Sequence, residues 1–117
     1  MTKKKEGASA LPKPSGYSIL IGLPEVETKT EGGVILPEEM AEREATASIL
    51  GFVLKMGPDC YSDNSRFPNG AWCKEGDWVL FRSYSGTRFK VFGQEFRLIT
   101  DDTVQAVIDD PQGYKRV

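Results

Sequence analysis

The sequence contains no histidine and only two cysteines, Cys60 and Cys73. Without histidine the chain lacks the commonest general base and cannot form a Ser-His or Cys-His nucleophilic pair. Two cysteines alone also cannot supply the four ligands of a usual structural zinc site. We therefore expect no catalytic residue, no metal site and no cofactor bound by this chain.

The sequence also lacks a long apolar run and an excess of basic charge. No apolar stretch approaches 18 residues, so we expect no transmembrane helix. Lysines near the N-terminus are not followed by an apolar segment, which predicts no signal peptide and a cytoplasmic protein. Cys60 and Cys73 are then expected to be reduced thiols. Because they flank residues 61–72, a disulfide under oxidation remains an alternative. The net charge of −2 gives no overall basic surface for nucleic acid.

Short apolar segments separated by glycine- or proline-marked turns dominate the rest of the chain. Such a pattern is typical of a small all-β domain, a barrel or a sandwich. We predict one domain over residues 17–110, with a flexible tail at 1–16 and a polar tail at 111–117. The segments that we predict to be strands are 17–23, 47–56 with a bend at Gly51, 78–81, 87–91 and 95–99.

Two further predictions concern the C-terminal half. Residues 87–91 and 95–99 flank Phe92-Gly93-Gln94, which predicts a β-hairpin. In residues 100–108 the apolar positions Val104, Val107 and Ile108 have the spacing of one helix face. Asp101 or Asp102 would be its N-cap.

Residues 25–47 interrupt the strand pattern. Their main apolar feature is the aliphatic tripeptide Val34-Ile35-Leu36, which follows Gly32 and Gly33 and precedes Pro37. The glycines allow many backbone conformations, and the proline disfavours helix at the residue before it. Two interpretations stay open here. The tripeptide is either a short core strand between polar turns or part of a flexible loop that offers aliphatic side chains to a partner.

Residues 38–45 contain good helix formers, but Met40 is the only large apolar side chain among them. Such a segment cannot bury an apolar face, so we expect no stable helix there. A structureless segment of about twenty residues is unusual inside a compact domain unless it has a function. This favours the interpretation of residues 25–47 as a functional loop.

Four segments follow one another along the chain: 25–37 with the aliphatic tripeptide, 51–58 with the pattern Gly-x-Val-x-x-x-Gly-Pro, 74–81 with the pattern Gly-Asp-x-Val-x-Phe and the turn at 84–87, and 95–108. In this order they resemble the mobile loop, two strands and the closing segment of the GroES-type co-chaperonin family. The resemblance covers about residues 17–109. The stretch 36–51 is longer than in most bacterial members, a feature of some bacteriophage-encoded co-chaperonins.

The resemblance implies a small GroES-like β-barrel with a mobile loop at about 25–47 and a roof-hairpin excursion at about 59–73. It implies that Val34, Ile35 and Leu36 contact a GroEL-type chaperonin and that Gly32 and Gly33 give the loop its mobility.

Further consequences concern assembly. The resemblance implies a homo-oligomeric ring, by analogy a heptamer, that closes a folding chamber around a non-native client protein, a capsid protein if the chain is viral. The nucleotide would belong to the chaperonin. Residues 17–23 would pair with residues 104–108 of the neighbouring subunit, with pairing inside one chain as the alternative. In the excursion, Tyr61, Phe67 and Trp72 would face the enclosed cavity or pack locally on the barrel.

Three other functions remain open. A nucleic-acid-binding barrel would use aromatic side chains and nearby cations as a stacking groove, namely Tyr84, Phe89, Phe92, Phe96, Arg82, Arg88, Lys90 and Arg97. A ring-forming phage assembly protein would use the tripeptide for its own assembly. A fragment of a zinc alcohol dehydrogenase, which contains a GroES-like domain, fits poorly because the chain lacks histidine and a dinucleotide-binding motif.

Overall fold

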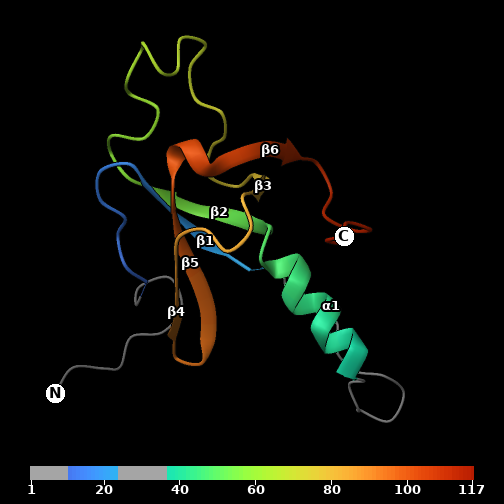
Figure 1. Ribbon diagram of the computed structural model, residues 1–117. Coiled ribbons are helices and arrows are strands. Elements are labelled where there is room, and N and C mark those ends of the chain that lie inside the picture. Colours follow the sequence, from blue (N-terminus) through green and yellow to red (C-terminus); the bar gives the residue numbers. More distant parts are fainter. Residues whose placement is uncertain (1–10, 24–36) are drawn as a thin grey trace, which may run out of the picture.

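The computed structural model describes residues 11–23 and 37–117 (Figure 1). Six strands form one antiparallel sheet in the order β4-β5-β1-β2-β3-β6. The all-β prediction is confirmed. In chain order the elements are β1 (Ser18–Gly22), α1 (Pro37–Ala47), β2 (Leu50–Met56), β3 (Trp78–Phe81), β4 (Thr87–Val91), β5 (Gln94–Thr100), the 3-10 turn η2 (Asp101–Thr103) and β6 (Val104–Ile108).

The strands curve around one apolar core. Alternation along β2 places Val53 in this core, while Phe52 and Leu54 point to the opposite face of the sheet. At Gly51 the strands approach so closely that a Cβ atom would overlap the Ile21 side chain, which explains the glycine. The buried core residues are Ile19, Ile21, Val53, Tyr61, Phe67, Cys73, Val79, Phe81, Ile99 and Val104.

The predicted hairpin is confirmed as β4–β5. Val91 pairs with Gln94, so the loop consists of two residues, Phe92 and Gly93. Both have positive φ, 49° and 82°. Two consecutive left-handed residues are what a type I′ turn needs, and this turn matches the twist of the flanking strands.

The predicted C-terminal helix is wrong. Residues 101–103 form the short turn η2, and Val104–Ile108 is strand β6, which pairs with β3. Neither aspartate is a helix N-cap, because both lie inside η2. The three apolar residues are β-branched and favour a strand. The spacing also misled because Val104 is buried whereas Val107 is 44 % exposed, so they do not share one buried face.

The expectation of no helix in residues 38–45 is also wrong, because α1 spans Pro37–Ala47. Proline suits the first helical position, and the acidic residues near it favour the positive end of the helix dipole. The reasoning about burial was correct, since Met40 is half exposed. The helix is instead fixed at its C-terminal end, where Ser48 N and Oγ both donate to Ala45 O at 3.1 and 2.6 Å. No helix in the described ranges is long and apolar enough to span a membrane.

The sheet order also corrects the predicted pairing between subunits. Strand β1 lies between β5 and β2 and pairs with both, so its two edges are already occupied. The alternative of pairing within the chain is therefore correct for residues 18–22. Strand β6 pairs with β3 on one side and ends the sheet, so its outer edge has no strand partner among the described residues.

Candidate functional site

The predicted site residues Gly32, Gly33, Val34, Ile35 and Leu36 lie outside the described residues, so their assignment stays a prediction. The structure does describe both ends of the segment that contains them. Strand β1 leads into this segment, and α1 follows it. The interval predicted as a loop, about 25–47, therefore includes a helix in its last 11 residues.

Strand β5 holds both ends of this segment. Phe96 pairs with Gly22, the last residue of β1. The next residue, Arg97, donates from Nη1 to Ser48 O at 3.2 Å, directly after α1. Sequence reasoning assigned Arg97 to a surface groove and missed this contact, because no local pattern marks a cation that bonds to a residue 49 positions away.

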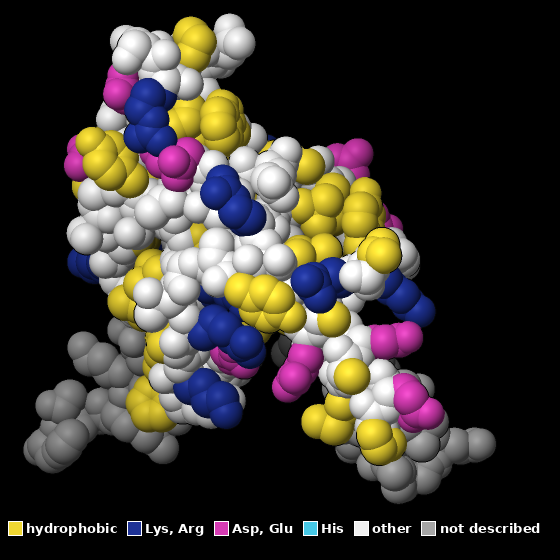
Figure 2. Space-filling model, in the orientation of Figure 1, with side chains coloured by type: hydrophobic (Ala, Val, Ile, Leu, Met, Phe, Trp, Pro, Cys, Tyr) yellow, Lys and Arg dark blue, Asp and Glu magenta, His cyan; other side chains and the backbone are white. Residues whose placement is uncertain are grey.

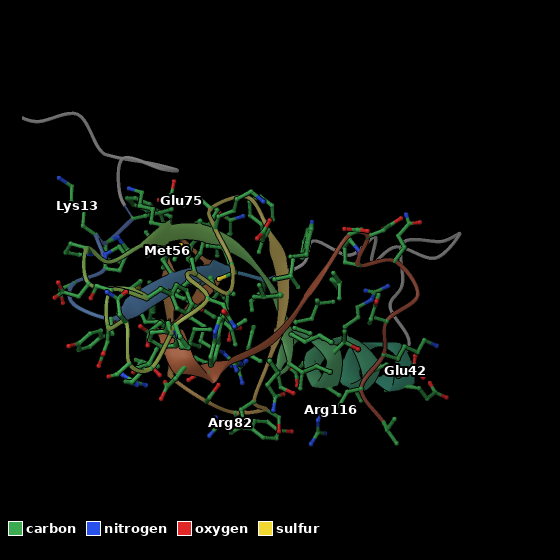
Figure 3. The ribbon with its side chains drawn as sticks, turned by 90° about the horizontal axis from the view of Figure 1, so that it is seen from above. Lys13, Glu42, Met56, Glu75, Arg82 and Arg116 are labelled. Atoms are coloured by element: carbon green, nitrogen blue, oxygen red, sulfur yellow. The ribbon has the colours of Figure 1, made fainter. Side chains whose placement is uncertain are left out.

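Helix α1 and the excursion between β2 and β3 lie at opposite ends of the molecule (Figure 1). Strand β2 connects them, beginning beside α1 and ending at Met56 (Figure 1). Seen from above, Met56 and Glu42 of α1 lie toward opposite ends (Figure 3). Glu38, Glu42 and Glu44 of α1 are exposed, and Figure 2 shows acidic side chains at the end of the molecule where α1 lies.

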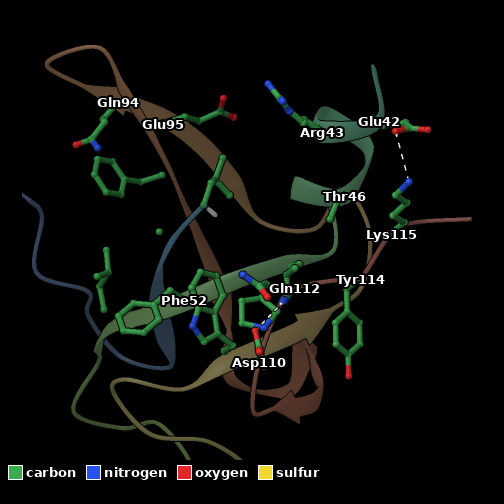
Figure 4. A pocket seen from close by; sticks show the side chains of 18 residues that line it. Glu42, Arg43, Thr46, Phe52, Gln94, Glu95, Asp110, Gln112, Tyr114 and Lys115 are labelled. Carbon is green, nitrogen blue, oxygen red and sulfur yellow. Dashed lines mark hydrogen bonds and ion pairs between the residues drawn. The ribbon is translucent and has the colours of Figure 1, made fainter. Parts of the chain in front are cut away.

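A pocket of about 960 Å³ opens between α1, the C-terminal tail and the sheet (Figure 4). Phe52 and Trp78 contribute to its apolar lining, with ring centroids 5.2 Å apart. Polar residues of α1 and the tail also line it, and Lys115 Nζ lies 3.8 Å from Glu42 Oε1. This ion pair is largely exposed and contributes little stability.

The excursion between β2 and β3 is closed by aromatic packing. Phe67 lies 4.9 Å from the rings of both Tyr61 and Trp72 in edge-to-face geometry. Tyr61 and Phe67 are buried, whereas Trp72 is 44 % exposed. Of the two interpretations given above, local packing is therefore correct for Tyr61 and Phe67, and only Trp72 presents a large surface to solvent.

Hydrogen bonds tie this excursion to η2. Tyr61 N donates to the buried Asp101 carboxylate at 3.0 Å, and Tyr61 Oη donates to Asp101 O at 2.8 Å. Burial and the hydrogen bond with Cys73 raise the pKa of Tyr61, so the phenol keeps its proton. The excursion is therefore part of the folded domain.

Both cysteines are free thiols. Cys60 Sγ donates to Ser18 O at 3.3 Å, and Cys73 Sγ lies 3.5 Å from Tyr61 Oη. Burial raises the pKa of Cys60 to about 11 and also raises the pKa of Cys73. Protonated thiols are poor nucleophiles, so these side chains serve packing and hydrogen bonding.

Two of the four cations of the stacking groove proposed for nucleic acid are not available to a ligand. Arg97 is fully buried, and Arg88 forms an ion pair with Glu95. Phe96 is buried as well. Among the groove residues, Tyr84 and Phe92 remain strongly exposed at 65 % each, and Arg116 covers the Tyr84 ring at 5.2 Å. The geometry does not favour this function.

Comparison with known proteins decides the family. The sequence model of the family described as "Chaperonin 10 Kd subunit" matches residues 12–108. The chain belongs to this family. Its match ends where β6 ends, so the C-terminal tail lies outside the family pattern.

Curated relatives of the chaperonin 10 Kd family are similar to the chain over most of its length. The protein of Corynebacterium jeikeium, named Co-chaperonin GroES, is 34% identical over 98 residues, which cover 83% of this chain and 93% of the relative. The Lawsonia intracellularis protein of the same name is 34% identical over 103 residues, covering 88% and 97%. Family membership assigns the chain the function of a co-chaperonin, and the GroES-type resemblance is confirmed.

Proposed function

We propose that this chain forms a ring that caps a GroEL-type chaperonin and closes its chamber around a non-native client protein. The proposal rests on the family match across residues 12–108, which includes the segment between β1 and α1. In this proposal Val34, Ile35 and Leu36 contact the chaperonin, and Gly32 and Gly33 give the segment its mobility.

Simple energetics support several weak contacts acting together. Burying one large aliphatic side chain contributes about 1.5–3 kcal/mol, so three contribute roughly 4–8 kcal/mol. Ordering the backbone costs roughly 1–2 kcal/mol per residue, so fixing the three contact residues alone offsets most of this gain. A single loop would therefore bind weakly. Several identical loops on one ring would bind tightly, because each contact raises the effective concentration of the next.

Assembly into a ring needs a contact between subunits. The outer edge of β6 offers backbone groups that a neighbouring subunit can pair with. A cyclic arrangement with seven subunits is our proposal for the oligomer, by analogy with the family. The nucleotide would bind to the chaperonin, and the chain would have no catalytic centre or cofactor of its own.

We propose a cytoplasmic location for this function. The stretch between Leu36 and Gly51 contains all of α1 and is longer than in most bacterial members of the family, which supports a bacteriophage origin. The location would then be the host cytoplasm, and the client class would be the viral capsid protein.

The test is light scattering after size exclusion, first on the chain alone and then with GroEL and ADP. We expect a ring that co-elutes with GroEL only when nucleotide is present. Ile35→Asp should abolish co-elution and leave the ring intact, because a buried carboxylate without a partner is strongly unfavourable. Val107→Asp, a matched change at an exposed β6 position, reports on the ring itself.

Each other outcome counts against a specific part of the proposal. Full capping by Ile35→Asp would refute the assignment of the tripeptide. A wild-type ring that never associates with GroEL would favour the assembly protein, and a monomer would refute the ring.

A further inference from the structure

Arg97 is a buried cation without a carboxylate partner among the residues that the structure describes. Its side chain is fully buried on β5, and its guanidinium lies 5.3 Å from the Phe81 ring centroid. Nη1 donates to Ser48 O at 3.2 Å and to Ser85 O at 3.4 Å. Nε and Nη2 have no hydrogen-bond partner within residues 11–23 and 37–117. The nearby Glu95 carboxylate is engaged by Arg88. Burying such a charge costs stability, so an apolar residue would suit the core better.

The Ser48 carbonyl explains the charge at this position. Ser48 follows the last residue of α1 and is itself buried. The C-terminal end of a helix carries a partial negative charge that a cation stabilises. The last turn of α1 contains no basic residue, so Arg97 supplies the cation from a distant strand. Tyr84 N also donates to Ser48 O, at 3.4 Å, which fixes this junction from a second side.

The position of Arg97 in the sheet adds a second argument. Its neighbour Phe96 pairs with Gly22, where β1 leads into the segment. Two consecutive residues of β5 therefore hold the segment 23–47 at its two ends. The Arg97 side chain bonds at the end formed by α1, whereas Gly22 pairs with the neighbouring residue Phe96.

We propose that Arg97 is a positioning residue that fixes α1 on the sheet and so sets how the segment 23–47 is presented to the chaperonin. The inference rests on the proposed function. It assigns to one buried side chain a role in binding a partner that it does not touch. The core tolerates the cost of the buried charge because the charge holds this helix.

Three variants test the proposal. Arg97→Met removes the charge and keeps much of the volume, whereas Arg97→Lys keeps a charge that can still bond to Ser48 O. Arg88→Met is the matched control, because Arg88 pairs with Arg97 across the hairpin but is exposed. Each is compared with wild type by hydrogen exchange, by thermal unfolding of the oligomer and by the concentration needed for half-maximal capping of GroEL with ADP.

We expect Arg97→Met to loosen α1 without destabilising the sheet. In Arg97→Met the amides of α1, Ser48 and Ile49 exchange about tenfold faster, as expected when one charge-assisted hydrogen bond is lost. The unfolding midpoint does not fall, because a buried unpaired charge has been removed. The half-capping concentration rises at least tenfold, because every subunit of the ring carries the change and the contacts act together. Arg97→Lys changes the amide exchange of α1 and the half-capping concentration less than Arg97→Met does, and Arg88→Met behaves as wild type.

The proposal is overturned if α1 exchanges at the wild-type rate in Arg97→Met, or if α1 loosens without any change in capping. A parallel loss of protection in α1 and in the whole sheet would reduce Arg97 to a structural residue. If wild type fails to cap GroEL, the proposed function and the presentation role fail together, and the exchange data alone decide whether Arg97 fixes α1.

Discussion

Phe67 is the side chain on which packing of the excursion between β2 and β3 depends. It is 2 % exposed, and its ring lies edge-to-face against both Tyr61 and Trp72. Truncating a buried phenylalanine to alanine costs about 3–5 kcal/mol. This figure includes the two aromatic contacts, each contributing about 0.5–1.5 kcal/mol. We expect Phe67→Ala to lower the free energy of unfolding by at least 3 kcal/mol on this scale.

The assay is chemical denaturation at one fixed protomer concentration, since the stability of an oligomer depends on concentration. Because Trp72 packs against Phe67, the fluorescence of Trp72 in folded Phe67→Ala should shift toward that of a solvent-exposed indole. Phe92→Ala is the matched control, because Phe92 is 65 % exposed, and we expect a loss below about 1 kcal/mol. Equal small losses in both variants would refute the packing argument.

Two other changes test the buried thiol and a close backbone approach. The folded pKa of Cys60, about 11, lies above its ordinary value of 9.0, so folding favours the protonated thiol. The free energy of unfolding should therefore fall as pH rises from about 9 to about 11. The fall should be less steep in Cys60→Ser. Equal slopes for the two proteins in pH-dependent denaturation would contradict this reasoning. Gly86 has φ 79°, and a Cβ atom there would overlap the Leu98 backbone. Gly86→Ala should lower the thermal midpoint well beyond Gly93→Ala, because Gly93 has a similar φ but open space around its Cα. Similar midpoints in the two variants would show that backbone strain alone matters.

Local patterns were sufficient for most of the sheet. Strands β1, β2 and β3 and the β4–β5 hairpin lie where apolar alternation and turn residues predicted them. The hairpin is the clearest case, because Phe92-Gly93 needs only two residues with positive φ. The ordered motifs also indicated the family, which the match over residues 12–108 confirms.

The two elements that were predicted wrongly depend on distant partners. The spacing of Val104, Val107 and Ile108 suits one helix face, but pairing with β3 makes this segment a strand. The composition of α1 shows no apolar face, and its stability comes from contacts at its end, including Arg97 from β5. Periodicity within a window reports neither kind of contact.

The sequence by itself therefore determined the class of fold, the turns and the family, because these depend on backbone preferences and on the order of short motifs. Tertiary structure alone decided that β1 is an interior strand, that the excursion packs on Asp101, and that a buried cation holds α1. The physical reason is that hydrogen bonds and burial join residues tens of positions apart. Their free energy depends on which groups the fold brings together.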